Sequence, residues 1–139
     1  MSLDENHEVV RRFNEEVWGK GWVDLVDEIF SPDFVDHYQA PGGPPGRDGI
    51  KYDVERVRAA FPDLEIKTED IVCEGDTAAL RWSGRGTYQG GIPGITATGT
   101  SVTMSGMHFY RFREGRIVER WDEFDGTAVM RQLGVSRLL

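Results

Sequence analysis

The residues of this sequence with the clearest potential for chemistry are an aspartate and a histidine in the segment 101–125. The segment is rich in β-branched and aromatic residues on both sides of a Glu114-Gly115 turn, which predicts a long antiparallel β-hairpin. His108 lies on its first strand and Asp122 on its second. Burial beside Trp121 would raise the pKa of the Asp122 carboxyl, and a nearby histidine could exchange protons with it. Asp122 and His108 are therefore a candidate acid–base pair.

Each of these residues also has a purely structural interpretation when it is considered alone. Asp122 could pair with Arg120 or another arginine at the surface, which is the commoner situation for a single strand aspartate. His108 could be a hydrogen-bonded core histidine, His37 could be a surface residue, and His7 is most simply a solvated side chain on a helix. The chemical interpretation depends on whether the side chains converge.

Convergence depends on the turn of the hairpin, because a slip of one residue moves every side chain of a strand to the other face. With only Glu114 and Gly115 in the loop, His108 and Asp122 would point to opposite sides of the sheet. We expect instead a three-residue loop in which Gly115 takes the left-handed position of a glycine bulge.

In the expected register, Phe112 pairs with Arg116, Tyr110 with Val118, His108 with Arg120, and Gly106 faces Asp122. One face of the hairpin then carries Gly106, His108, Tyr110, Arg120 and Asp122. The opposite face carries Met107, Phe109, Ile117, Glu119 and Trp121, and would suit a second packing surface.

The elements around the hairpin are helices first and strands later. Apolar residues recur at helical spacing in three segments, 4–18, 23–30 and about 47–61. Four segments, 64–73, 77–88, 102–113 and 116–124, have the composition of strands, whereas residues 40–46 read as a Pro/Gly loop and 90–99 as a flap at one end of the sheet. This order indicates the α+β class, and 139 residues suit a single domain, 1–139.

The charge balance argues against nucleic acid or an anionic membrane as a partner. The chain carries 16 basic and 24 acidic residues, a net charge of −8, without a dense Lys/Arg cluster that could neutralise phosphates. No apolar run approaches the roughly 18 residues of a membrane span, and the N-terminus lacks the pattern of a signal peptide. We therefore expect a soluble, cytoplasmic protein.

The sequence contains no pattern that indicates a metal or a cofactor. The single cysteine, Cys73, has no second thiol beside it, and Asp36, His37 and His108 are too few for a ligand set. No glycine pattern follows a strand and opens a helix to hold phosphate, and no nucleophile elbow is present. We expect neither a metal nor a cofactor.

Short motifs along nearly the whole chain resemble one family when they are taken in order. They are Val17-Trp18 with Gly21, Phe34-Val35-Asp36-His37, Ala60-Phe61-Pro62-Asp63-Leu64, Gly75-Asp76 with Arg81-Trp82, Gly91-Ile92-Pro93, Thr98-Gly99, residues 112–119 and Trp121-Asp122. With them the chain resembles the SnoaL-like polyketide cyclases and related ester cyclases, within the superfamily named after nuclear transport factor two. The resemblance implies a cystatin-like α+β barrel, in which a cone-shaped, curved, mostly antiparallel sheet wraps around a pocket closed by three N-terminal helices. It also implies a homodimer, which we expect to form through the sheet.

The resemblance implies a cofactor-free activity, the intramolecular aldol-type ring closure of a small apolar carbonyl compound. Asp122 would be its acid, and His37 and His108 would be the pocket histidines. The residues expected to line the substrate pocket are Trp18, Phe34, Tyr38, Trp82, Tyr110 and Arg120. Two other functions stay open on the same fold, a non-catalytic small-molecule-binding or assembly module and an epoxide hydrolase or isomerase-type enzyme.

Overall fold

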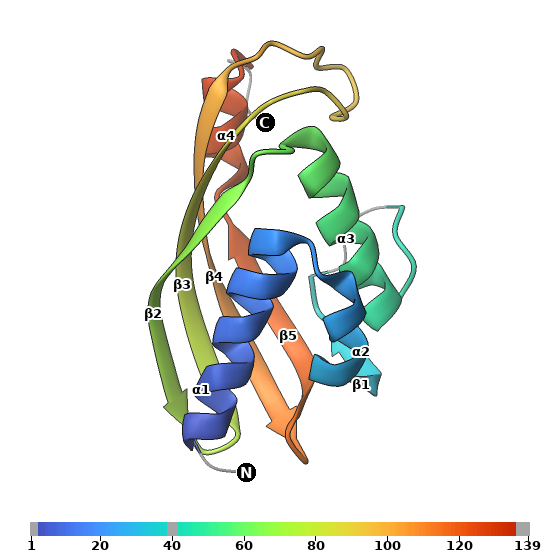
Figure 1. Ribbon diagram of the computed structural model, residues 1–139, viewed down its shortest axis with the longest axis vertical. Helices are drawn as coiled ribbons and strands as arrows, with labels where there is room; N and C mark the ends of the chain where they lie inside the picture. The colour runs from blue at the N-terminus through green and yellow to red at the C-terminus, as the bar shows by residue number, and fades with distance from the viewer. Residues whose placement is uncertain (1–2, 39–41, 136–139) are drawn as a thin grey trace.

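A curved five-stranded sheet forms one side of the computed structural model, which describes residues 3–38 and 42–135 (Figure 1). Its strands are β1 (Phe30–Asp36), β2 (Glu65–Glu74), β3 (Thr77–Thr87), β4 (Ser101–Arg113) and β5 (Arg116–Phe124), in the order β1-β5-β4-β3-β2. Strands β2 to β5 form an antiparallel meander, whereas β1 pairs in parallel with β5. The expected α+β cone is confirmed.

Helices cover the concave face of this sheet (Figure 1). Helix α1 (Leu3–Arg12) continues as a π-helix, η1 (Phe13–Trp18), and is followed by η2 (Val23–Leu25), α2 (Val26–Ile29) and α3 (Arg47–Ala60). A further helix, α4 (Gly126–Gln132), follows β5 and packs against β4. Within the described part of the chain, none of these helices has the length and apolarity needed to cross a membrane.

The core lies between the concave face and the helices because residues alternate strictly between the two faces of the long strands. Along β4, every second side chain from Val102 to Phe112 is buried, and those between them are exposed. Phe13 of η1 and Phe30 of β1 meet edge to face at 4.8 Å, and Phe34 packs on Phe30 at 4.7 Å. The concave face is therefore filled with apolar side chains at the end where β1 and α1 begin.

Two elements were not expected from the sequence, the edge strand β1 and the short helix α4. Pro32 lies within β1, where it is tolerated because β1 is the edge of the sheet. Helix α4 has only seven residues and is fixed by tertiary contacts, since Gln132 accepts from the Thr103 amide at 2.8 Å and donates to the Thr103 carbonyl at 2.8 Å. Of the expected Pro/Gly loop, residues 40 and 41 lie outside the described residues, and 42–46 are irregular.

The hairpin between β4 and β5 has a different register from the one that we expected. Glu114 and Gly115 both have positive φ, 51° and 81°, as a two-residue hairpin loop of the type I′ kind requires. Arg113 therefore pairs with Arg116 instead of lying in a three-residue loop. The expected glycine bulge at the turn is wrong.

A bulge occurs further along the second strand, at Val118. Phe112 faces Ile117, but Arg111 faces Glu119, so Val118 is an extra residue on β5. The bulge reverses the in-and-out alternation beyond it, which brings His108 directly opposite Asp122. The two side chains share the concave face as predicted, although through another bulge. Ile117, expected on the outer face, is fully buried on the concave side.

Candidate active site

A cavity of about 390 Å³ lies between the concave face of the sheet and the helices. Its wall comes from η1, α3, β2, β3, β4, β5 and α4, and from the irregular segment after β3, which arches over this end of the sheet (Figure 1). The apolar part of the wall comprises Val57, Ala60, Phe61, Leu64, Ile66, Ile92, Met104, Phe124, Val129 and Met130. A cavity of this size and character suits a small organic molecule.

His108 and Asp122 meet inside this cavity as cross-strand neighbours. Their side chains are 7% and 8% exposed, and His108 Nε2 lies 3.3 Å from Asp122 Oδ1. Burial raises the pKa of Asp122 to about 6, against the opposing effect of the Arg120 charge. Burial also holds the pKa of His108 well below its usual value, so the imidazole is neutral. The pair therefore combines a neutral base with a carboxyl group that titrates close to neutral pH.

Arg120 is compensated by Asp36, and Asp122 pairs with no guanidinium group of the residues that the structure describes. Its Nη2 donates to Asp36 Oδ2 at 2.9 Å and its Nε to Oδ1 at 3.2 Å, with side chains only 2% and 5% exposed. Arg81, another candidate partner, pairs with Asp70 at 2.6 Å. The interpretation of Asp122 as part of a surface ion pair is therefore wrong. Sequence reasoning missed the role of Asp36, because the strand that carries it was not expected.

Several buried polar atoms in the cavity wall have no hydrogen-bond partner among the described residues. They are Trp18 Nε1, Trp82 Nε1, Asp53 Oδ1, His108 Nδ1, Tyr110 Oη and Asp122 Oδ1. Buried polar groups are normally satisfied, so a group of them around one cavity makes it a candidate site for a polar ligand. Among the described residues, no three His, Cys, Asp or Glu side chains converge as a ligand set for a metal ion.

Asp53 of α3 is a cavity residue that sequence reasoning overlooked. It lies on the apolar side of α3, three residues after Ile50 and beside Val54. This helical spacing could have predicted that the Asp53 side chain is buried. Burial raises the pKa of its carboxyl group. The cavity wall therefore contains, besides Asp122, another carboxyl group whose pKa is raised by burial.

Trp82 is positioned by a glycine on the neighbouring strand. It faces Gly106 across β3 and β4, and Phe124 faces Gly106 from β5. The rings of Trp82 and Phe124 stack at 6.1 Å, and a Cβ on Gly106 would lie only 2.8 Å from Trp82 Nε1. The absence of a side chain at position 106 therefore lets the indole lie across the sheet beside His108.

Two of the expected site residues lie elsewhere. His37 is on the outer side of the sheet, where its ring stacks on Trp121 at 4.7 Å and its Nε2 contacts Glu119 Oε2 at 2.9 Å. His37 therefore does not line this cavity, because successive residues of an extended chain point to opposite faces and Asp36 takes the inner one. Phe34 is a core residue and is absent from the cavity wall. The other expected pocket residues, Trp18, Tyr38, Trp82, Tyr110 and Arg120, do line the cavity.

Comparison with known proteins gives one family and many similar structures. The family model for SnoaL-like polyketide cyclases matches residues 8–133. IdmH from Streptomyces antibioticus, described as a candidate polyketide cyclase, is 32% identical with a TM-score of 0.78, over 92% of this chain and 97% of IdmH. A candidate polyketide cyclase from Acidithiobacillus ferrooxidans is 29% identical with a TM-score of 0.82, over 99% of this chain and 100% of the other.

AclR from Streptomyces galilaeus, described as a candidate hydroxylase, is 28% identical with a TM-score of 0.84, over 99% of this chain and 90% of AclR. A search of curated proteins found no match. The similar structures thus carry more than one described activity on one fold. The family match covers most of the chain, and the chain belongs to the family of SnoaL-like polyketide cyclases.

Proposed function

We propose that this protein is a cofactor-independent cyclase that closes a ring in a small apolar carbonyl compound by an intramolecular aldol-type reaction. The observation that carries the proposal is the contact between neutral His108 and a carboxyl group with a pKa of about 6, inside an apolar cavity. A group whose pKa lies near the working pH can both accept and donate a proton in one cycle.

In the proposed reaction, the Asp122 carboxylate removes a proton from a carbon atom next to a carbonyl group and becomes a carboxylic acid. The resulting enolate attacks a second carbonyl carbon of the same molecule, and the new carbon–carbon bond closes the ring. Asp122 then returns the proton to the alkoxide oxygen, so the product is an isomer of the substrate. His108 hydrogen-bonds the carboxyl group or the enolate and keeps it in position.

The negative charge of the enolate and alkoxide needs hydrogen-bond donors or positive charge close by. The indole N–H of Trp82 and the hydroxyl group of Tyr110 are buried in the cavity wall without partners among the described residues. The Arg120 guanidinium lines the same wall, and Tyr110 faces it across β4 and β5. These three groups are the proposed stabilisers of the developing charge.

The cavity also helps to distinguish the cyclase from a non-catalytic assembly or binding module. An assembly module whose interior is filled by its own side chains is contradicted by an interior space of about 390 Å³. A module that binds a small molecule without converting it would keep the cavity but would not need a titrating pair within it. The cyclase proposal accounts for both features.

The test is turnover of aromatic polyketide precursors that carry an acidic CH group and a free carbonyl, followed by chromatography and mass spectrometry for a product of unchanged mass. Asp122→Asn is expected to lower the rate by about 10²- to 10⁴-fold, the usual contribution of a general acid or base. Asp70→Asn, which changes an exposed aspartate paired with Arg81, is the matched control and should retain the rate. Unchanged turnover in Asp122→Asn would refute the proposed chemistry.

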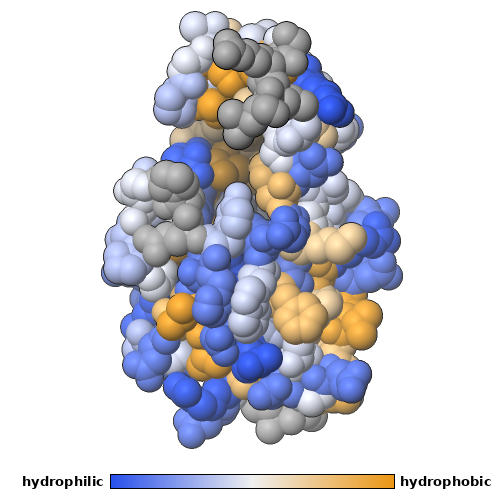
Figure 2. All heavy atoms as spheres, turned by 180° about the vertical axis from the view of Figure 1, so that it is seen from behind, coloured by the Kyte–Doolittle hydropathy of each residue, from blue (hydrophilic) through white to orange (hydrophobic). Residues whose placement is uncertain are grey.

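We also propose that the outer face of the sheet is the contact of a homodimer. Val72, Met107 and Phe109 expose 64%, 59% and 46% of their surface there, and Figure 2 shows apolar side chains exposed among hydrophilic ones on the reverse of the molecule. His37, stacked on Trp121, belongs to this face. Sedimentation of Met107→Glu is expected to give a monomer where the wild-type protein gives a dimer, and a wild-type monomer would contradict the proposal.

A further inference from the structure

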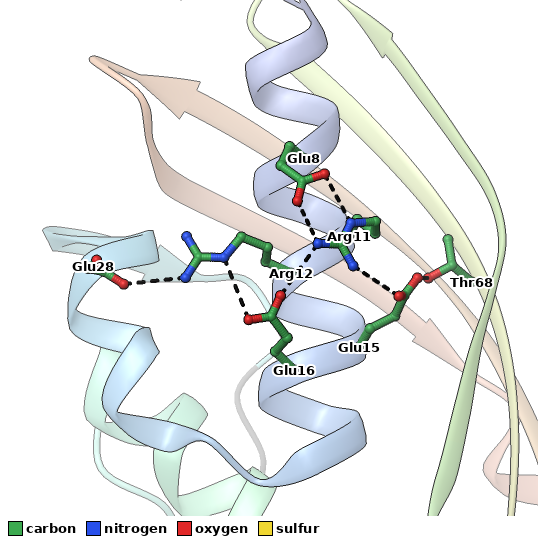
Figure 3. A network of polar contacts seen from close by, with 7 residues as sticks. All are labelled: Glu8, Arg11, Arg12, Glu15, Glu16, Glu28 and Thr68. Atoms are coloured by element: carbon green, nitrogen blue, oxygen red, sulfur yellow. Dashed lines mark hydrogen bonds and ion pairs between the residues drawn. The ribbon is translucent and has the colours of Figure 1, made fainter.

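A chain of hydrogen bonds connects the surface of α1 with the cavity. Arg11 Nη1 donates to Glu15 Oε1 at 3.0 Å, and the Thr68 hydroxyl donates to Glu15 Oε2 at 2.7 Å (Figure 3). Beyond the residues drawn there, Asn14 Nδ2 donates to Thr68 Oγ1 at 2.9 Å. Asn14 is only 3% exposed and lines the cavity.

This chain fixes which end of the Asn14 amide faces Thr68. A carboxylate can only accept hydrogen bonds, so Glu15, already paired with Arg11, takes the single hydroxyl proton of Thr68. The Thr68 oxygen can then only accept, and its partner must be the NH₂ group of Asn14. The amide oxygen of Asn14 is therefore turned away from Thr68, and Asn14 itself lines the cavity.

The local helix geometry places a donor beside this acceptor. Asn14 and Trp18 both lie on the π-helix η1 and both line the cavity. Trp18 Nε1 is buried without a partner among the described residues. A π-helical turn inside an α-helix is uncommon and occurs often at functional sites. Here it places Asn14 and Trp18 in the part of the cavity wall that a helix contributes.

We propose that Asn14 is a specificity-determining residue that accepts a hydrogen bond from a hydroxyl group of the ligand, and that Thr68 and Glu15 are positioning residues for its amide. With the Trp18 indole as the neighbouring donor, the ligand class is a hydroxylated aromatic compound, a phenol or enol that also carries an oxygen acceptor. The inference rests on the proposed function only in placing the ligand in this cavity, and it concerns binding rather than turnover.

The test uses a matched pair of probes that differ only in the hydroxyl proton, 2-naphthol and 2-methoxynaphthalene. Isothermal titration calorimetry of the full chain is expected to give about tenfold tighter binding of 2-naphthol, as one buried hydrogen bond would produce. Glu15→Gln should reduce this ratio to about one. The side-chain amide of the new glutamine can donate to Thr68 Oγ1. The Thr68 hydroxyl proton is then free to bond the Asn14 oxygen, and the side-chain amide of Asn14 turns around.

The control is Glu8→Gln, which removes another carboxylate partner of Arg11 without touching Thr68, and which should keep the tenfold ratio. Thr68→Ser should keep it as well, because serine retains the hydroxyl group, whereas Thr68→Val should lose it. Equal affinity of the wild-type protein for the two probes, binding of neither, or an unchanged ratio in Glu15→Gln would each overturn the inference. Failure of the cyclase proposal alone would give a different result, in which turnover is absent but 2-naphthol still binds about tenfold more tightly than 2-methoxynaphthalene.

Discussion

Replacement of Asp122 by asparagine should stabilise the folded protein, and by more at high pH than at low pH. The pKa of Asp122 rises from 3.8 to about 6 in the cavity, chiefly because burial disfavours the charged carboxylate. The folded pKa is thus above the unfolded one. Ionisation therefore costs stability, and the cost is absent below the unfolded pKa, grows between the two pKa values and is complete above the folded one. Asparagine has a similar shape and removes this cost.

The magnitude follows from the shift of about two pKa units. At 1.36 kcal/mol per unit, the full cost at pH 8 is about 3 kcal/mol. At pH 4.5 the carboxyl group is protonated in the folded state, and this pH lies less than one unit above the unfolded pKa of 3.8, so the cost is only about 1 kcal/mol. The stabilisation by Asp122→Asn should therefore increase by about 2 kcal/mol from pH 4.5 to pH 8.

Urea unfolding of the wild-type protein and the variant at the two pH values measures this difference directly. Asp70→Asn is the control, because the Asp70 side chain is 61% exposed and lies on the outer face. An equal effect of Asp122→Asn at both pH values would refute the burial argument. A destabilisation that grows with pH would show that the carboxylate is held by a cation in the folded state.

Two further substitutions test the groups around this pair. Gly106→Ala should destabilise the fold by about 1–3 kcal/mol and shift the tryptophan fluorescence, because the new Cβ would lie 2.8 Å from Trp82 Nε1. The control is Gly126→Ala, whose Cβ would meet nothing closer than 3.7 Å and which should change neither the stability nor the fluorescence. Arg120→Leu should cost about 3–5 kcal/mol at neutral pH because it leaves the buried Asp36 carboxylate without a cation. Urea unfolding would show most of this loss reversed when Asp36→Asn is added, and an additive second loss would contradict the pairing.

The long periodic elements could be predicted from sequence, and the short or irregular ones could not. Helix α3 and strands β2 to β5 follow clear helical or alternating patterns, and all lie close to their predicted positions. Strand β1 contains Pro32 and three polar residues, and its position depends on pairing with β5, which no local pattern encodes. Helix α4 depends likewise on its contacts with β4.

The candidate site shows the same limit at the level of single residues. The shared face of His108 and Asp122 was predicted, but the responsible bulge at Val118 has no turn residue to mark it. Bulges of this kind are decided by packing on both faces of the strand rather than by a special residue. His37 was misplaced because its sequence neighbour Asp36, not His37 itself, takes the inward position.

The missed strand β1 also decides how Asp122 behaves. Arg120 lies two residues before Asp122 on β5, and in the absence of another anion its guanidinium would favour ionised Asp122 and lower its pKa. Because β1 pairs in parallel with β5, Asp36 lies next to Arg120 and takes two of its hydrogen bonds inside the core. Burial then outweighs the remaining attraction of Arg120 in setting the pKa of Asp122. The edge strand, through the pairing of Asp36 with Arg120, thereby allows the pKa of Asp122 to rise, as the proposed proton transfer requires.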